Sequence, residues 1–454
     1  MPRSSGRWYW GVLFNLKAHF ITVESILIAM IYNCILVRYT GEFGVKSTQS
    51  QEYIEDLLLN NIRRALYTSG GQDFLDRIKF VTRQGRLYIN FEKEQDTDVD
   101  LLISVVGQTF GLSSISPCFR TSVRDKTAVV SVAAKLMVAH GIVPGSSKLA
   151  VRAIKNPKLD IPSLKQDIIK LGKKIAFENG SKKEFSRLRF KKGPKWKMGP
   201  WNGEIERMLE IEVYKDQAFI SAERIKSPGG FPLGLEDQLV TLVSGGLDSP
   251  VAAWLAMRRG AIPVFVSMDP HNDRKGSKVN ISTVREKALE NIRVLVDYTK
   301  GAIEKPIVYV VPYESALDAF IKHGSKKGIT CLLCKRFMYR VAEHISFLHG
   351  CQGIVTGEIL GEQASQTAKN LRVLDSAVMM PVHRPLFGFD KDEVVTLASR
   401  IGTMPIANIV SDPCKGVPNH PTIRGDLFKV EEAEEKINIK KCLEQCLSGI
   451  EKVS

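Results

Sequence analysis

The segment SGGLDS at 244–249 has the residue types of an anion-binding loop. An apolar, strand-like run precedes it, and a helical pattern begins at Pro250. Two glycines let the backbone approach a ligand closely, and the amides of the loop and of the helix N-terminus then form an anion site. A plain Gly-Gly turn beside a helix cap is the structural alternative. Because Asp248 adds a negative charge, we expect it to meet a magnesium ion or to orient the loop.

The cysteine thiols are the second group of residues that could take part in a reaction. Eight cysteines are spread along the chain, which excludes a small disulfide scaffold and fits free thiols in a reducing compartment. Cys331 and Cys334 form a CxxC at the start of a predicted helix, a pattern compatible with zinc, a redox pair or two buried thiols. Structural zinc normally needs four ligands, and there is no second CxxC in the sequence. We predict that Cys34, Cys118 and Cys351 lie in the core. We assign no role to Cys442 and Cys446.

Hydrophobic periodicity predicts two small α+β units followed by a larger α/β unit. The first two units are expected to contain a strand at 31–38, a helix at 51–66, a hairpin at 78–92, helices at 127–140 and 163–178, and a hairpin turning at 215–216. The Gly/Pro-rich segment 227–234 indicates a linker. Beyond it, strands alternate with helices, which predicts a parallel, doubly wound sheet covered by helices.

Composition narrows the class of partner. Among 454 residues, 64 Lys and Arg against 49 Asp and Glu give a net charge of +15, which points to a polyanionic partner. The apolar stretch 20–37 is interrupted by Glu24 and Asn33, and the N-terminus lacks the pattern of a signal peptide. We therefore expect a soluble, cytoplasmic protein without a membrane partner.

The stretch 182–197 is strongly basic and contains three aromatic residues. Basic side chains neutralise phosphates while aromatic rings stack on unpaired bases, although a solvated lysine-rich loop is the plainer alternative. The predicted RNA contacts are Lys182, Lys183, Arg187, Arg189, Lys191 and Lys192.

The motif SGGxDS between a strand and a helix resembles the pyrophosphate-binding loop of the ATP pyrophosphatase (PP-loop) superfamily. Further stretches resemble one family within it, the tRNA 4-thiouridine synthetases, in the archaeal type that lacks a rhodanese domain. These stretches are ILVRYTGEFGVKS, CKRFMYRVAE, TGEILGEQASQTAKNL, RPLFGFDKDEV and PCKGVPNHPT. Their order and spacing extend the resemblance over nearly everything from residue 30 onward.

The resemblance implies a multidomain α/β and α+β fold. The implied order is an extension of unassigned role at 1–29, a ferredoxin-like domain at 30–100, a THUMP RNA-binding domain at 101–226 and an adenine nucleotide alpha hydrolase-like PP-loop domain at 235–454. The implied ATP-binding residues are Leu242, Val243, Ser244, Gly245, Gly246, Asp248, Ser249, Ser267, Met268, Lys335, Gly357 and Gln366. Lys335 stands where many relatives have Arg, and Ser267-Met268 replaces a His-Phe pair common in bacterial members.

The implied activity is ATP-dependent sulfur transfer to a tRNA uridine, at position 8 in the family, through an adenylated intermediate. Asp248 and Cys414 are the implied catalytic residues, and ATP and Mg²⁺ are required. Cys331, Cys334 and Cys414 are expected to hold an iron–sulfur cluster (3Fe-4S or 4Fe-4S). A persulfide on Cys414, resolved by the CxxC pair, is the competing mechanism.

Partners implied by the resemblance are tRNA, a sulfur donor (a cysteine desulfurase or free sulfide) and a second copy in a homodimer. Two other functions are compatible with parts of the sequence: a PP-loop amidotransferase or ligase acting on a small molecule, and a non-catalytic RNA-binding protein. The N-terminal half argues against the first, and the intact loop at 244–249 argues against the second.

Overall fold

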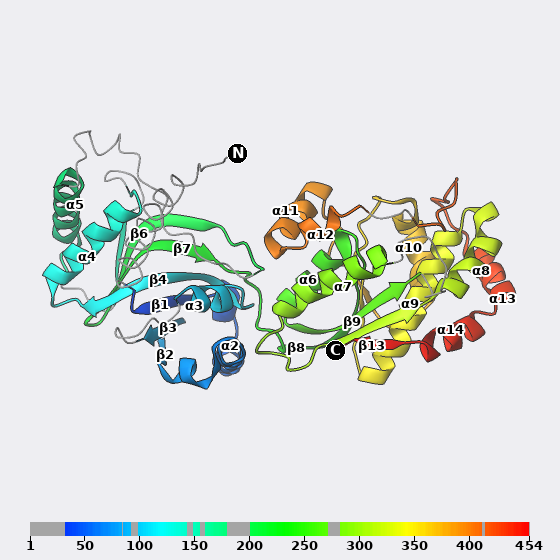
Figure 1. The fold of residues 1–454 in the computed structure, drawn as a ribbon, viewed down its shortest axis with the longest axis horizontal. Coiled ribbons are helices and arrows are strands. Elements are labelled where there is room, and N and C mark those ends of the chain that lie inside the picture. Colours follow the sequence, from blue (N-terminus) through cyan, green and yellow to red (C-terminus); the bar gives the residue numbers. More distant parts are fainter. Residues whose placement is uncertain are drawn as a thin grey trace, which may run out of the picture.

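Two bodies of helices and strands lie end to end along the longest axis of the molecule (Figure 1). The computed structural model describes residues 32–83, 85–91, 99–142, 149–154, 159–178, 200–270, 282–410 and 414–453. Strands of the first body end at Lys226, and those of the second begin at Glu236. Each body has its own sheet.

The first body contains one continuous sheet of seven described strands in the order β2-β3-β1-β4-β7-β6-β5. Its strands are β1 (Cys34–Tyr39), β2 (Ile78–Arg83), β3 (Arg86–Phe91), β4 (Leu112–Ser122), β5 (Leu149–Ile154), β6 (Ile205–Tyr214) and β7 (Gln217–Lys226). Both predicted hairpins are confirmed, because β2 pairs with β3 and β6 with β7, in each case antiparallel. β1 also pairs with β4, so the sheet runs without a break across residue 100.

Helices cover one face of this sheet. They are η1 (Gly41–Val45), α2 (Thr48–Asp76), α3 (Val99–Val106), α4 (Lys126–Ala139) and α5 (Ile161–Glu178). Their apolar residues form a single core with the inward positions of the strands, such as Ile35, Val37 and Ile220. The alternation of side chains along a strand places the intervening residues on the opposite face.

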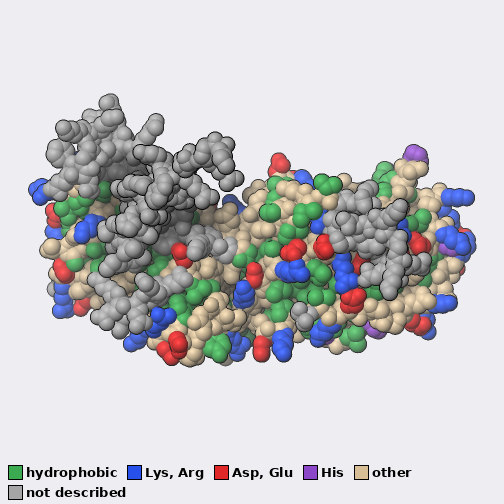
Figure 2. Space-filling model, viewed as in Figure 1, with side chains coloured by type: hydrophobic (Ala, Val, Ile, Leu, Met, Phe, Trp, Pro, Cys, Tyr) green, Lys and Arg blue, Asp and Glu red, His purple; other side chains and the backbone are tan. Residues whose placement is uncertain are grey.

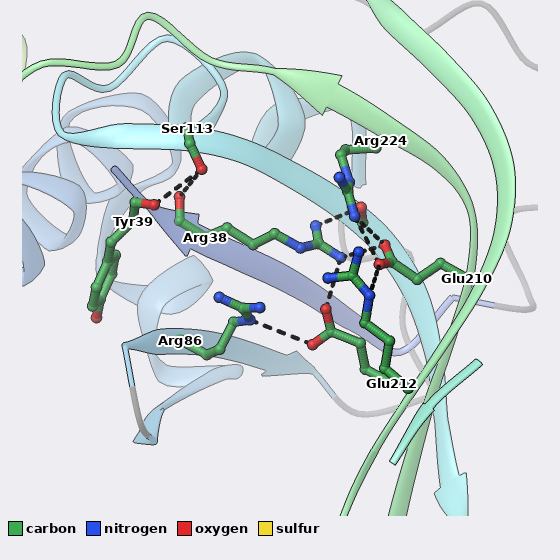
Figure 3. A network of polar contacts seen from close by, with 9 residues as sticks. Arg38, Tyr39, Arg86, Ser113, Glu210, Glu212 and Arg224 are labelled. Carbon is green, nitrogen blue, oxygen red and sulfur yellow. Dashed lines mark hydrogen bonds and ion pairs between the residues drawn. The ribbon is translucent and has the colours of Figure 1, made fainter. Parts of the chain in front are cut away.

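That opposite face carries a buried network of ion pairs (Figure 3). Arg38 contacts Glu210 at 2.7 Å and Glu212 at 3.4 Å, while Arg224 and Arg86 bind the same two carboxylates from neighbouring strands. Burial alone would raise the pKa of Glu210, but the adjacent Arg38 and Arg224 outweigh it and lower that pKa. Removing one partner of such a pair leaves a buried charge and costs about 3–5 kcal/mol. The network therefore ties β1 and β3 to β6 and β7.

The second body contains a six-stranded sheet in the order β12-β11-β8-β9-β10-β13. Its strands are β8 (Glu236–Leu242), β9 (Ala261–Asp269), β10 (Ile307–Pro312), β11 (Ile354–Val355), β12 (Val382–His383) and β13 (Glu451–Val453). All neighbouring pairs are parallel except β10 with β13. The predicted parallel sheet is confirmed, with an antiparallel edge strand added from the C-terminal segment.

Helices cover both faces of this sheet, as doubly wound folds require. They are α6 (Asp248–Arg258), α7 (Ser282–Asp297), α8 (Glu314–Gly324), η3 (Ser325–Lys327), α9 (Thr330–His349), η4 (Ala364–Gln366), α10 (Ala368–Asp375), α11 (Lys391–Ile401), α12 (Met404–Ala407), α13 (Leu427–Ile437) and α14 (Ile439–Ser448). One core packs under α6, α7 and α11, and the other under α8, α9, α10, α13 and α14.

The order in which strands are added to the sheet reverses at β8, and this reversal determines where a ligand can bind. β9 and β10 extend the sheet on one side of β8, whereas the later strands β11 and β12 extend it on the other. In open α/β sheets, ligands bind beyond the carboxyl ends of the strands at such a switch point. The loop at 244–249 follows the carboxyl end of β8, so it lies at this position.

The two bodies are packed against each other. Trp201 stacks on Trp254 with ring centroids 5.2 Å apart, and the Asn61 side chain donates to the carbonyl of Leu233 at 2.8 Å. The connecting segment 227–234 forms no helix or strand, yet most of it is buried. The predicted linker is thus part of the interface. None of the described helices combines the length and apolar character needed to cross a membrane.

Candidate nucleotide and thiol site

Two serines brace the loop between β8 and α6. The Ser249 hydroxyl accepts from the Ser244 amide at 2.9 Å, and the two hydroxyl oxygens lie 2.9 Å apart. The Gly246 amide donates to the Ser244 hydroxyl at 3.3 Å. These contacts fix the loop just before α6, whose first amides have no partner within the helix. The loop and the helix N-terminus therefore present donors to an anion from a rigid backbone.

Helix α7 holds the loop from behind. The Asn291 side chain is fully buried, and its Nδ2 donates to the carbonyls of Ser244 at 2.9 Å and Gly246 at 3.4 Å. A Cβ on Gly245 would lie 2.7 Å from the Cβ of Lys287, so only glycine fits against this helix. Asn291 was not predicted from the sequence. It lies more than forty residues beyond the loop, and it looks like an ordinary polar position of an amphipathic helix.

Gly357 packs directly on the start of α6. A Cβ at this position would lie 2.6 Å from the Ser249 nitrogen and 2.7 Å from its Cα. Gly357, one of the implied ATP-binding residues, therefore approaches the loop backbone itself. Leu242 and Val243 lead into the loop beside it, and the Val243 amide donates to Val266 of β9 at 2.9 Å.

A lysine bridges two carboxylates at the mouth of the loop. Lys391 Nζ lies 3.0 Å from Asp248 Oδ1 and 2.5 Å from Glu362 Oε1. Burial raises the pKa of Asp248, and the hydrogen bond from Lys391 opposes that shift. Lys391 begins α11 within RPLFGFDKDEV, a stretch that supported the family resemblance without being assigned to the site.

A second cation, Lys335, approaches the loop from α9. Its Nζ donates to Glu358 Oε1 at 3.2 Å, and its charge acts to lower the pKa of Asp248. Burial would raise the pKa of Glu358, but Lys335 and then Arg384 outweigh it, so that pKa is lowered and the carboxylate is ionised. Lys335 therefore lies within electrostatic reach of the loop, with a buried counter-charge.

The remaining predicted nucleotide residues occupy the same edge of the sheet or the segment beside it. Ser267 is buried and Met268 half-buried at the end of β9, next to β8. Gln366 in η4 is 4% exposed, and its Oε1 has no hydrogen-bond partner among the described residues. A buried amide without a partner is costly, and a nucleotide base or ribose offers the donor that would satisfy it.

The three predicted cluster cysteines lie in two segments of the second body. Cys331 and Cys334 lie in the first turn of α9, and Cys414 is exposed on a later loop. Burial raises the pKa of Cys334 to about 12, a shift that Cys414 and Cys331 reinforce and a contact with the Tyr313 hydroxyl at 3.9 Å opposes. Burial also raises the pKa of Cys331, with Cys414 adding to it. The protonated thiol is therefore favoured at Cys331 and Cys334.

The other sequence predictions separate into core and undescribed residues. Cys34, Cys118 and Cys351 are buried as predicted. The six predicted RNA contacts, from Lys182 to Lys192, lie outside the described residues, as does the extension 1–29. In the view of Figure 2, basic and acidic side chains are interspersed over the second body instead of forming one basic face.

A braced, glycine-containing loop at the switch point of a parallel sheet defines the second body as a nucleotide-binding α/β domain. Residues 234–439 match the family model "Thiamine biosynthesis protein (ThiI)", and residues 34–116 match "ThiI ferredoxin-like domain". The chain belongs to the ThiI family. The predicted family and fold class are confirmed.

Individual relatives agree with this assignment. A probable tRNA sulfurtransferase of Thermococcus kodakarensis is 32% identical over 87% of this chain and 94% of its own, and one of Methanosarcina acetivorans is 30% identical over 92% and 93%. The crystal structure of a 4-thiouridine synthetase–RNA complex with bound ATP is 25% identical, with a TM-score of 0.68, and covers 93% of this chain and all of the other. PH1313 from Pyrococcus horikoshii, 21% identical with a TM-score of 0.50 over 82% and 99%, shares the fold.

The contact between Gly357 and the loop can be tested by adding one methyl group. Gly357→Ala should weaken ATP binding about tenfold or more, because the Cβ must displace the start of α6. Titration calorimetry with ATP measures the effect. Gly388→Ala is the matched control, since a Cβ there meets no atom within 4 Å. Equal ATP affinity in the Gly357 variant and the control would contradict the placement of the nucleotide.

Proposed function

We propose that this enzyme uses ATP to adenylate O4 of a tRNA uridine and then replaces that oxygen with sulfur, forming 4-thiouridine. The observation that carries the proposal is the braced loop at the β8 switch point, with Lys335, which directly follows Cys334 on α9, bound to Glu358 beside it. The relatives named tRNA sulfurtransferase and the 4-thiouridine synthetase–RNA complex with bound ATP support the same activity.

ATP is needed because a carbonyl oxygen of the uracil ring is a poor leaving group. In the first step, O4 bonds to the α-phosphorus and the bond to pyrophosphate breaks. In the second, sulfur bonds to C4, the C4–O4 bond breaks, and AMP leaves with the former O4. The loop amides and Lys335 stabilise the negative charge on the phosphates, as preorganised donors do in catalysis. Gln366 is proposed to contact the base or ribose.

Magnesium fits the carboxylates beside the loop. Asp248 and Glu362 share one ammonium group, that of Lys391, so two oxygen donors already converge on a cation. Carboxylate oxygens together with substrate phosphates are the usual ligands of magnesium in nucleotide sites. We propose that Asp248, assisted by Glu362, holds the ion, which would neutralise phosphate charge.

The thiols at the start of α9 are the type of ligand that binds an iron–sulfur cluster. The set of ligands consists of three thiols, and burial raises the pKa of Cys331 and Cys334, so thiolates there need a compensating positive charge. Within the described residues no set of three or more Cys, His, Asp or Glu side chains is arranged to hold a metal ion. Cys414 directly follows 411–413, which lie outside those residues. We propose Cys331, Cys334 and Cys414 as ligands; a bound cluster would offer an open iron that can carry sulfide.

A persulfide route uses the same residues without a metal. Cys414 is exposed, so a sulfur donor can reach it, whereas Cys331 and Cys334 are partly covered. Sulfur carried on Cys414 would attack C4, and a thiol of the CxxC would then release it by forming a disulfide. A cysteine desulfurase, which delivers sulfur already bound as a persulfide, is the donor proposed for this route, and free sulfide is a donor only for the cluster route.

Removing the Asp248 carboxylate tests the role of the loop. Asp248→Ala should reduce tRNA-dependent pyrophosphate release and 4-thiouridine formation by about a hundredfold or more, because it removes a preorganised charge at the phosphates. Binding of tRNA, measured by filter retention, should stay unchanged. Asp237→Ala changes an exposed carboxylate at the start of β8 and serves as the control. Undiminished thiolation by Asp248→Ala would refute the assignment, and pyrophosphate release without tRNA would favour a small-molecule ligase.

Iron and sulfide analysis after anaerobic purification tests the cluster. The wild-type protein should contain both elements and absorb visible light, and serine at Cys331, Cys334 or Cys414 should lower the iron content. Cys442→Ser, at a half-buried thiol of α14, should leave it unchanged. A colourless, iron-free protein that still thiolates tRNA would leave only the persulfide route.

A further inference from the structure

Glu358 is a buried carboxylate, 5% exposed, whose two oxygens have different partners. Oε2 accepts from Tyr339 at 2.6 Å, from Arg384 Nε at 2.8 Å and from Thr356 at 3.0 Å. Oε1 accepts from Lys335 Nζ at 3.2 Å. One oxygen therefore anchors the carboxylate to α9, β11 and the segment after β12, and the other holds the lysine.

The held lysine is tied to the segment that packs on the nucleotide loop. Lys335 is long and flexible, and a lysine loses substantial rotamer entropy when its ammonium is fixed in one place. Its Nζ has three N–H donors, of which the contact with Glu358 uses one. Glu358 follows Gly357, which packs on the backbone of Ser249, so the ammonium that Glu358 holds is tied to the segment that contacts the loop. The carboxylate is thus built into the same rigid junction as the loop.

We infer that Glu358 is a positioning residue: it fixes the Lys335 ammonium beside the phosphate loop before the nucleotide arrives. This inference rests on the proposed binding of ATP at the loop. On this inference, Glu358 contributes to ATP affinity only indirectly, by holding Lys335 in place. A purely structural Glu358 would instead affect stability without any coupling to Lys335.

Because the two oxygens of Glu358 have different partners, one substitution can remove the contact with Lys335 and keep the other contacts. Arg384 can only donate, so in Glu358→Gln the amide oxygen must take the Oε2 place and keep the contacts with Tyr339, Arg384 and Thr356. The amide NH₂ then faces the Lys335 ammonium, donor against donor, and the tether is lost. Tyr339→Phe is the matched control, because it removes a hydroxyl from Oε2 and leaves the tether in place.

The experiment measures ATP affinity by titration calorimetry for the full-length wild type, Glu358→Gln, Lys335→Met, the double variant and Tyr339→Phe. Glu358→Gln should weaken ATP binding about tenfold, the usual scale for one hydrogen bond to a charged group. The double variant should bind no more weakly than Lys335→Met, and Tyr339→Phe should stay within about twofold of wild type. Melting curves of each variant check that it is folded, and Glu358→Asp, which withdraws the carboxylate from Lys335, should weaken binding in the same way.

Two results would overturn the inference: wild-type affinity in both Glu358 variants, or losses from Glu358→Gln and Lys335→Met that simply add. Both would be seen in a protein that still binds ATP. A wild-type protein that binds no ATP would instead refute the proposed function, so the two failures are distinguishable.

Discussion

The structure of the site depends on how the backbone of one short loop is held. A loop can offer amides to a phosphate only if its own shape is maintained by other groups, because water would otherwise compete for its donors. Ser244 and Ser249 close the loop from within, and Asn291 binds its carbonyls from α7. Gly357 lets the segment after β11 pack against it from another side. Packing on both sides thus creates an anion site before any ligand is present.

Charge is distributed around this loop in a way that suits a two-step reaction. Lys391 lies between Asp248 and Glu362 at one side, while Lys335, which directly follows Cys334 on α9, is bound to Glu358. Each lysine is paired with at least one carboxylate, and for the partly buried Lys335 this pairing limits the cost of burial. Lys335 can therefore act both on the phosphates of the nucleotide and on the cysteines that carry sulfur.

How much of this could be predicted depends on whether the signal is local. The loop with its flanking strand and helix follows from residue types at short spacing, and the parallel sheet follows from alternating patterns. Gly357 was implied by the family resemblance. Asn291, Glu358 and Lys391 could not be found that way, since tertiary packing brings them from α7, the segment after β11 and α11. The edge strand β13 was missed because three residues carry too little periodicity.

The most direct test of the account follows one oxygen atom. A tRNA transcript carrying a heavy oxygen isotope at O4 of the target uridine is converted with ATP and a sulfur donor, and the AMP formed is analysed by mass spectrometry. The account predicts that the heavy oxygen appears in AMP, because O4 must bond to the α-phosphorus before sulfur displaces it. Thiolated tRNA accompanied by unlabelled AMP, with the isotope in water, would contradict it.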